Sequence, residues 1–325
     1  MIIIKLLRKI YIRFFFNIPI KKIPECIENP HQASKLIYDT LISDEPSMIA
    51  RFGSTELATL INYLEVKKQD KNIWKYIKTG LPWWWEQNII DQMQQWSGFF
   101  PPTKDKIEQF CELMLQDIKE VDILGSWIAN EYYFEDRLMA KKVHLRLLDP
   151  FGFETQTPWT AALKDKKILI VHPFVELMIS QYQNRTLLFN NKDVLPTFAS
   201  IAGIKAIQSL GAADPRFSDW FEALSFMKAK INEQDYDICL IGAGAYGFPL
   251  AAHVKRMGKK AVHMGGSLQL LFGIRGKRWD DPNYGVKEWG IPKGSYSNLV
   301  NEHWVRPGDN LKPKNSQQVE GSCYW

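Results

Sequence analysis

Several kinds of site are missing from this 325-residue sequence. Its four cysteines lie far apart and form no C-x-x-C pair, which argues against a disulfide framework and against a zinc site. Its six histidines form no H-E-x-x-H or comparable metal motif. The scattered cysteines are typical of reduced thiols in the cytosol. With 46% hydrophobic and 24% charged residues, the composition is that of a folded protein.

Acidic residues are absent from two stretches of the chain. Residues 1–22 hold six basic residues and no acid, so the remainder has a net charge of 5 − 6 = −1. Residues 238–279 hold seven basic residues, again without an acid. Basic charge concentrated in two zones predicts two anionic partners and disfavours general nucleic-acid binding.

The first twenty residues have no charge-free run of the ~18 residues that a membrane span requires, and no small-residue signal cleavage site. Their basic and apolar residues take opposite sides of a helix, which predicts an amphipathic helix over 1–20. We expect residues 1–16 to bind an anionic membrane surface, which makes the protein cytoplasmic and peripheral on the inner face of the plasma membrane. The alternative is a basic first helix packed on the core. The two sides are Lys5, Arg8, Lys9 and Arg13, and Ile3, Leu7, Ile10 and Phe14.

Apolar runs of strand length alternate with segments of helical spacing after residue 30. This alternation predicts an α/β fold. We expect a smaller α/β region over 21–160 that holds the acceptor or metal site. Residues 161–325 are expected to form a Rossmann-like region with a mostly parallel sheet that binds the nucleotide. The predicted strands are 47–51, 122–126, 144–148, 166–173, 206–209 and 237–241, and the main predicted helices are 33–43, 56–64, 74–95, 107–120, 175–185 and 219–232.

A glycine-rich loop, I-G-A-G-A-Y-G-F-P, follows the apolar strand at 237–241 and opens a helix. Gly242, Gly244 and Gly247 form the pattern G-x-G-x-x-G in the strand–loop–helix context that phosphate binding requires. Glycine lets the backbone approach a phosphate closely, and the helix start offers N–H groups to it. Tyr246, inside the loop, is expected to stack on a base or a sugar. The alternative is a glycine turn needed only for tight packing.

A nicotinamide cofactor predicts an acid about 20 positions after such a loop, where it binds the ribose. This chain has His263 and Met264 at that place, and its next acid is Asp280. We therefore expect no NAD. The acid-free basic stretch favours the diphosphate of a nucleotide sugar instead.

A second strand of this unit is expected to begin after Gly258. Beyond it lies a glycine pair, Gly265 and Gly266, expected at the carboxyl end of that strand, where ligands bind in α/β sheets. Arginines bind phosphate in bidentate geometry, so the basic residues that follow are candidates for a phosphate clamp. The alternative is a solvated basic loop. The predicted nucleotide-binding residues of this segment are Gly265, Gly266, Gln269, Arg275, Lys277 and Arg278.

A second loop, R-F-G-S-T-E, follows the strand at 47–51. Arg51 and Gly53 are expected to bind the nucleotide, and Glu56 to bring a carboxylate to a ligand or a metal, unless Glu56 only caps the next helix. His172, at the end of the strand 166–173, is a catalytic candidate or a core histidine. Asp149 is a weaker candidate metal ligand or a turn former.

Two motifs together resemble a known family. R-F-G-S-T-E-L resembles the R-F-G-D-G-E-type segment of the GT-D-fold bacterial glycosyltransferases, and I-G-A-G-A-Y-G-F-P-L-A-A-H resembles their C-terminal strand–glycine–helix. L-L-F-G-I-R-G-K-R-W and the final V-E-G-S-C-Y-W resemble, with the glycine segment, a group of proteins from bacterial surface-polysaccharide gene clusters. This closer likeness covers most of 45–325.

The resemblance implies a glycosyltransferase that moves a sugar from a nucleotide sugar to a lipid-linked glycan in capsule or lipopolysaccharide synthesis. The family's D-x-E motif is associated with a divalent metal, so Mn²⁺ or Mg²⁺ is implied here. Ser54 replaces the aspartate of that motif, which leaves Glu56 as metal ligand or as catalytic base. The alternatives are a Rossmann-type sugar-nucleotide oxidoreductase and a non-catalytic component of polysaccharide assembly.

Overall fold

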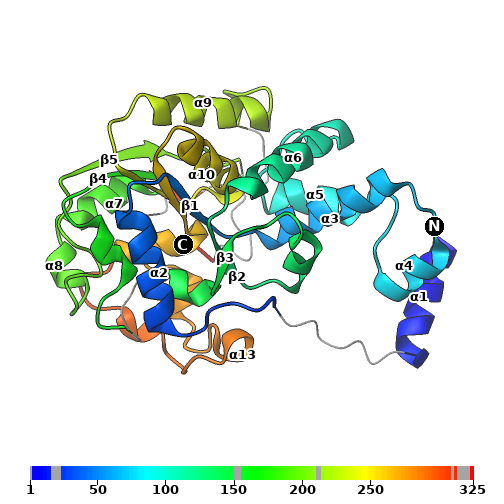
Figure 1. Cartoon of the computed structure of the whole chain (residues 1–325), viewed down its shortest axis with the longest axis horizontal. Helices are drawn as coiled ribbons and strands as arrows, with labels where there is room; N and C mark the ends of the chain where they lie inside the picture. The colour runs from blue at the N-terminus through cyan, green and yellow to red at the C-terminus, as the bar shows by residue number, and fades with distance from the viewer. Residues whose placement is uncertain (1, 16–22, 150–154, 210–213, 309–310, 313–322) are drawn as a thin grey trace.

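One sheet of seven parallel strands runs through the protein (Figure 1). The computed structural model describes residues 2–15, 23–149, 155–209, 214–308, 311–312 and 323–325. Its strand order is β3-β2-β1-β7-β6-β4-β5. The strands are β1 (Ser47–Ala50), β2 (Ile123–Ser126), β3 (Lys141–His144), β4 (Lys167–His172), β5 (Ser200–Lys205), β6 (Ile238–Ile241) and β7 (Lys260–His263).

The two predicted regions meet inside this sheet. β1, β2 and β3 come from residues before 160 and β4 to β7 from residues after it, and β1 pairs with β7 through Met48 and Ala261. The predicted α/β class with parallel strands is confirmed. Both predicted regions contribute strands to one continuous sheet.

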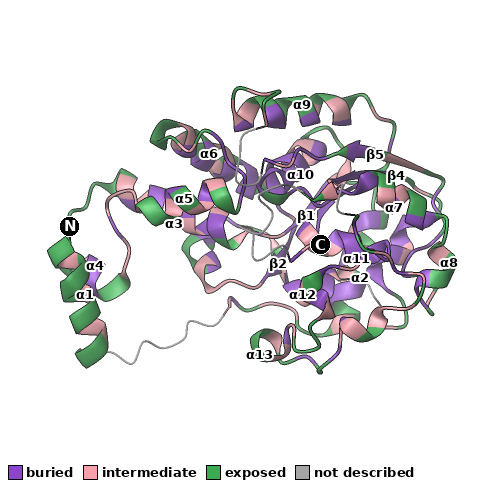
Figure 2. Cartoon of the chain, turned by 180° about the vertical axis from the view of Figure 1, so that it is seen from behind, coloured by how far each residue is buried: buried purple, intermediate pink, exposed green. Residues whose placement is uncertain are grey.

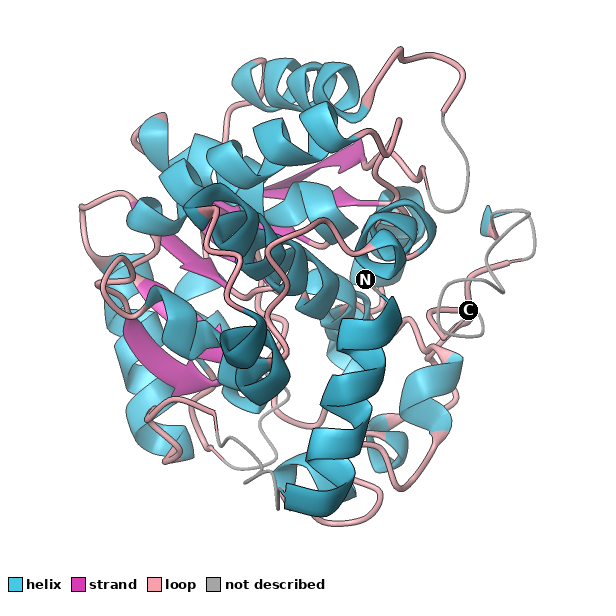
Figure 3. Cartoon of the chain, turned by 90° about the vertical axis from the view of Figure 1, so that its right-hand side faces the viewer, coloured by secondary structure: helices cyan, strands magenta, loops and turns pink. Residues whose placement is uncertain are grey.

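Helices cover both faces of the sheet, as Figure 3 shows. Side chains alternate along each strand, so Ile168 and Ile170 of β4 enter one core while Leu169 and Val171 enter the other. The first core includes α2, α7 and α11, and the second α3, α6, α9 and α10. The helices are α1 (Ile2–Phe15), α2 (Pro30–Ile42), α3 (Ser54–Lys68), α4 (Ile73–Thr79), α5 (Gln87–Gln95), α6 (Lys104–Asp117), α7 (Val175–Tyr182), α8 (Arg185–Leu188), α9 (Trp220–Asn232), α10 (Gly247–Arg256), α11 (Leu268–Leu271), α12 (Lys277–Asp280) and α13 (Val286–Trp289).

Two predicted strands were wrong, and both errors concern the edges of the sheet. The segment predicted as a strand at 144–148 is mostly a 3₁₀ turn, Leu145–Leu148, directly after β3. The strand predicted at 206–209 follows β5, which lies at 200–205. An edge strand is buried less than a central one, so its sequence lacks the continuous apolar run that marks β4 or β6.

The predicted N-terminal helix is present as α1, and residues 16–20 of that prediction lie outside the described residues. α1 has no buried residue and lies beside α4, away from the sheet (Figures 1 and 2). Across the described ranges, we find no helix with the length and apolar character needed to traverse a bilayer.

Candidate functional site

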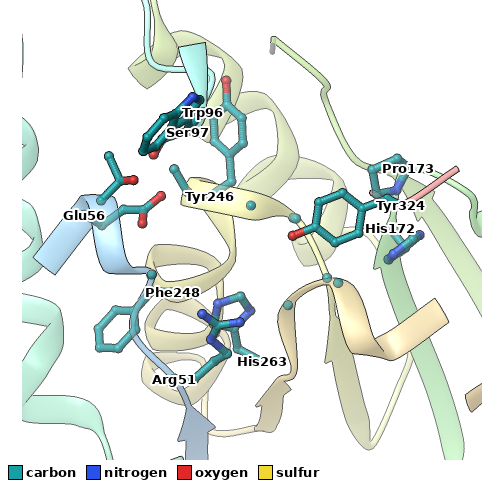
Figure 4. A pocket seen from close by; sticks show the side chains of 18 of the residues that line it. Arg51, Glu56, Trp96, Ser97, His172, Pro173, Tyr246, Phe248, His263 and Tyr324 are labelled. Atoms are coloured by element: carbon teal, nitrogen blue, oxygen red, sulfur yellow. The ribbon is translucent and has the colours of Figure 1, made fainter. Parts of the chain in front are cut away.

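A cavity of about 250 Å³ opens at the carboxyl edge of the sheet (Figure 4). All seven strands supply its wall, either with their last residue or with one that follows within two positions. Parallel strands place their carboxyl ends at one edge, which is where ligands bind in open α/β sheets. The wall residues that follow or end the strands, from β1 to β7, are Arg51, Trp127, Leu145, His172, Ile207, Gly242 and His263.

Arg51 places a guanidinium group in the cavity without a carboxylate partner. It has five N–H donors, and two bonds go to the carbonyl oxygen of Phe52, from Nε at 3.1 Å and from Nη2 at 2.9 Å. Within the described residues, no acid lies within ion-pair distance of it. Burial lowers the pKa of Arg51 from its ordinary value, which reflects the cost of holding this charge away from water. The remaining donors are suited to an anionic ligand.

Trp127, which was not among the residues predicted from the sequence, packs against the guanidinium of Arg51. The guanidinium lies 4.8 Å from the centre of the Trp127 ring, and the indole N–H donates to the Phe52 carbonyl at 3.0 Å. Glu131 is fully buried and accepts from the backbone N–H groups of Trp127 and Ile128, each at 3.0 Å, and from the Ser126 hydroxyl. This buried carboxylate therefore fixes the loop that carries Trp127.

Glu56 lies in the first turn of α3 and lines the cavity opposite Tyr324 (Figure 4). Its carboxylate folds back over Gly53, where a Cβ atom would come within 1.8 Å of Oε2. It makes no hydrogen bond or ion pair with the residues that the structure describes. Ser54, which stands in place of the family's aspartate, also lines the cavity.

The residues present do not form a metal-binding cluster. Across the described parts of the chain, no group of three or more His, Cys, Asp or Glu side chains is arranged to hold an ion. Glu56 is the acidic residue of the cavity wall, and the wall as described contains no other acidic side chain. Because Mg²⁺ and Mn²⁺ prefer several oxygen ligands, an ion here would depend on the oxygens of its ligand.

His172 and His263 end β4 and β7 and are 3% and 5% exposed. Burial lowers the pKa of His172 to about 3. Burial, followed by the nearby Arg51 charge, lowers the pKa of His263 to about 3 as well. Both rings are therefore neutral at physiological pH, and each can offer a hydrogen bond without adding charge to the cavity.

The three loop positions Gly242, Gly244 and Gly247 differ in the structural reason for having a glycine. A Cβ at Gly242 would meet the Gly265 carbonyl oxygen at 2.6 Å, and one at Gly247 would meet the His263 ring at 2.1 Å. Gly244 has φ +53°, and a Cβ there would meet nothing within 4 Å. Packing therefore explains Gly242 and Gly247, whereas Gly244 faces open space. Gly242 and Gly244 line the cavity, and Gly247 begins α10 just outside its wall.

Tyr246 is 2% exposed, and its ring stacks on Trp220 at 4.8 Å between ring centres. Its hydroxyl lies 3.0 Å from that of Ser209. The ring is thus part of the core beside the cavity, although Tyr246 contributes to the wall. One ring face is already covered, which limits the expected stacking on a ligand.

The glycine pair after β7 receives the C-terminal residues. A Cβ at Gly266 would lie 2.1 Å from the Tyr324 ring, which occupies that space and lines the cavity. The segment is held by bonds from Gln269 Nε2 to the Tyr324 carbonyl at 3.2 Å, and from the Arg278 N–H to the Cys323 carbonyl at 3.0 Å. Gln269 is fully buried and lines the cavity with Gly265 and Gly266. The aromatic C-Y-W ending is the sequence signal for this contact.

Of the three basic residues predicted to clamp phosphate, Arg278 lines the cavity, with its guanidinium 4.9 Å from the Tyr324 ring centre. Arg275 pairs with Asp280 at 2.9 Å, and neither Arg275 nor Lys277 belongs to the wall. Two other basic residues of the acid-free zone at 238–279 pair with acids that are distant in the sequence. Arg256 binds Asp117 at 2.6 Å and Glu120 at 2.9 Å, and Lys255 binds Asp122 at 2.8 Å.

Asp149 lies outside the cavity wall. Its carboxylate accepts a hydrogen bond from the Tyr296 hydroxyl. Burial raises the pKa of Asp149 to about 6, against the lowering effects of hydrogen bonds from Tyr296 and Ser267 and of the Arg51 charge. The structure therefore places Asp149 in a hydrogen-bonded network behind the site and does not bring it to Glu56.

Comparison with known proteins gives structural neighbours. No protein-family model matches the chain, and no curated protein matches it. A solved structure reported as a new glycosyltransferase (DUF1792) from Streptococcus sanguinis is similar, with 12% identity and a TM-score of 0.36 over 91% of this chain and 98% of that one. A second, described as a domain of unknown function 1792 with a distinct glycosyltransferase fold, has 11% identity and a TM-score of 0.36 over 90% and 99%.

The similarity to glycosyltransferase structures that the two motifs predicted is therefore confirmed. TM-scores below 0.5 support no functional argument, so the function is inferred from the residues of the cavity.

Proposed function

We propose that this protein transfers a sugar from a nucleotide-sugar donor to a lipid-linked glycan in the assembly of a bacterial surface polysaccharide. The observation that carries the proposal is Arg51, a cation without an acidic partner among the described residues, in a cavity at the carboxyl edge of the sheet. Holding a charge away from water costs free energy unless a counter-charge binds. A diphosphate supplies that counter-charge.

The other wall residues suit the same donor. Arg278 adds a second positive charge against the single carboxylate of Glu56, and both histidines are neutral. Gly244 leaves open space beside the loop for a phosphate. Aromatic side chains that can stack on a base or a sugar also line the cavity: Trp96, Trp127, Tyr284, Trp289, Tyr324 and Trp325.

The transfer uses four side chains of the cavity wall. The acceptor hydroxyl oxygen forms a bond to the anomeric carbon of the donor sugar while the bond from that carbon to the phosphate oxygen breaks. Glu56 takes the hydroxyl proton as general base, since its carboxylate makes no competing bond among the described residues. His172 donates from Nε2 to a phosphate oxygen of the leaving nucleotide, and Arg51 and Arg278 stabilise its charge. If Mn²⁺ or Mg²⁺ takes part, Glu56 is the residue that holds it.

The test is a thermal-shift and calorimetric titration with UDP, GDP and CMP sugars and with NAD(P), followed by a donor screen for released nucleotide with and without manganese. We expect one class of nucleotide sugar to stabilise the protein. Arg51→Gln should weaken its binding by about tenfold or more, because a charged hydrogen bond is worth about 1.5–3 kcal/mol. Arg137→Gln, at an exposed arginine outside the cavity, is the control and should bind as the parent does.

Two outcomes would overturn the proposal. Stabilisation by NAD(P) without any response to nucleotide sugars would indicate an oxidoreductase. Intact glycan synthesis in cells carrying Glu56→Gln or Gly244→Val, together with its loss when residues 2–15 are deleted, would indicate a non-catalytic assembly component.

A further inference from the structure

Helix α1 has three distinct faces. Its least exposed residues are Ile4, Arg8, Tyr11 and Ile12, whose spacing forms one stripe along the helix. This stripe is the docked face. Arg8 Nη1 donates to the carbonyl of Ile77 at the end of α4 at 2.9 Å, and α4 lies beside α1.

A second face is apolar and exposed to solvent. It is formed by residues at helical spacing, with Ile3 72%, Ile10 44% and Phe14 70% exposed. Most of the exposed large apolar side chains that the structure describes in its first 40 residues lie on this one helix. The apolar face consists of Ile2, Ile3, Leu6, Leu7, Ile10 and Phe14.

The third face is basic and lies between the other two. At about 100° per residue, Lys5, Lys9 and Arg13 project between the docked stripe and the apolar face. Lys5 pairs with Glu86 at 2.7 Å, whereas Lys9 and Arg13 have no ion pair within the described residues. α1 contains no acidic residue. The exposed side of the helix therefore presents an apolar strip with free positive charge along one edge.

A bilayer with anionic headgroups matches both parts of this surface. An interfacial helix buries its apolar side chains among the acyl chains while its lysines and arginines remain at the phosphates. Fourteen residues span about 21 Å, too short for the ~30 Å hydrocarbon core, so α1 lies along the surface. A second copy of α1 fits less well, because α1 contains no acidic residue that could pair with Lys9 and Arg13 of the other copy.

We propose that the apolar face of α1, with Lys9 and Arg13 at its edge, is a docking surface for an anionic lipid bilayer. This surface goes beyond the proposed sugar transfer and stands independently of it. The structure changes the predicted set of headgroup contacts at one residue. Arg8 belongs to the docked face and holds α1 on α4, so it is not a headgroup contact.

The region that carries α1 and α4 is connected to the cavity wall through Asn62 and helix α5. Asn62 of α3 is 2% exposed and makes two hydrogen bonds to the segment between α4 and α5. Its Nδ2 donates to the Trp84 carbonyl at 2.9 Å, and its Oδ1 accepts from the Glu86 N–H at 3.0 Å. α5 then runs for nine residues, about 14 Å, to Trp96 in the cavity wall. The hydrogen bonds of Asn62 and helix α5 thus connect the region beside α1 to the cavity wall, which suits an acceptor carried on a lipid.

The test is flotation of the full chain with vesicles of phosphatidylcholine, with and without one-third phosphatidylglycerol. We expect binding to the anionic vesicles that weakens as salt is raised. Leu6→Asp with Ile10→Asp should weaken binding at least tenfold, since each change removes a large apolar side chain from the bilayer. Lys9→Gln with Arg13→Gln should weaken it about 25-fold, at about fivefold for each charge.

The matched control is Ile42→Asp with Leu187→Asp, at apolar residues that are both 49% exposed and belong to α2 and α8. These changes should leave vesicle binding unchanged, and circular dichroism and thermal unfolding check that all variants fold. Arg51→Gln should also bind vesicles as the parent does, so failure of the sugar-transfer proposal is distinguishable from failure of this one.

Three results would overturn the inference: no binding of the parent to anionic vesicles, equal binding of the α1 variant and the parent, or equal binding to both vesicle types at all salt concentrations. Sedimentation velocity without lipid tests the second-copy alternative. A dimer that Leu6→Asp with Ile10→Asp dissociates would assign the apolar face to self-association.

Discussion

The Nδ1 atom of His172 accepts a hydrogen bond from the backbone N–H of Phe174 at 3.0 Å. Nδ1 is therefore unprotonated, and the neutral ring carries its proton on Nε2. That nitrogen lies beside the glycine loop, 3.2 Å from the position of a Cβ at Gly242. His172 thus has a fixed donor directed at the loop, which agrees with the donor role proposed for it.

His172 should make the protein more sensitive to acid. Burial lowers the pKa of His172 to about 3, so below pH 6.5 the unfolded chain takes up a proton that the folded ring does not. The folded state therefore loses stability as pH falls, by about 2 kcal/mol between pH 7 and pH 5. His172→Gln removes this contribution, so urea unfolding at the two pH values should differ by about 2 kcal/mol less than in the parent.

Comparison of variant with parent is essential, because Asp117 and Asp149 act in the opposite direction. Burial raises the pKa of each to about 6, so they favour the folded state as pH falls towards 4. Gln32→Ala, at an exposed position of α2 without an ionisable group, is the control and should keep the parent's pH dependence. An unchanged slope in His172→Gln would contradict the neutral buried ring.

Glu131→Gln should destabilise the fold and weaken ligand binding together. The carboxylate is fully buried and accepts three hydrogen bonds, so an amide leaves one donor facing its new N–H₂ group. We expect a loss of about 1–3 kcal/mol in the free energy of unfolding. Since the bonds hold the loop under Arg51, nucleotide-sugar affinity should fall too. Asp136→Asn, at an exposed carboxylate on the same segment, should change neither quantity.

Gly266 and Tyr324 should be energetically coupled. A Cβ at Gly266 would lie 2.1 Å from the Tyr324 ring, so Gly266→Ala should cost about 1–3 kcal/mol of stability by overpacking. In a Tyr324→Ala background the same change should cost little, because the ring is gone. Urea unfolding of the two single variants and the double variant measures this coupling. Strict additivity would mean that the ring does not occupy this space.

Arg256→Gln should destabilise the protein by about 3 kcal/mol or more without weakening ligand binding. It removes the partner of Asp117, a fully buried carboxylate 2.6 Å from Arg256 Nη1. Chemical denaturation and calorimetric titration measure the two effects. Lys230→Gln, from an exposed pair with Glu233, is the control and should be nearly neutral. Loss of ligand binding in a folded Arg256→Gln protein would contradict this prediction and indicate that Arg256 takes part in ligand binding.

The positions of the central strands were predictable because each is an apolar run buried on both faces. β1, β4 and β6 were expected within two residues of their observed limits, whereas the edge strands β3 and β5 were misplaced. Among the predicted site residues, those directly after these central strands do meet at one cavity. Arg51, His172 and Gly242 come from strands that are close neighbours in the sheet.

The sequence by itself determined the α/β class, the strand–glycine–helix unit and the amphipathic α1, because each depends on the spacing of residues that are close in the chain. Only the tertiary structure decided which charges face the cavity. Arg256 and Lys255 pair with acids 136 and 133 positions away, so two of the seven basic residues of the acid-free stretch are neutralised from elsewhere in the fold. The pairing of β1 with β7 likewise brings Arg51 beside Gly265, which no local pattern encodes.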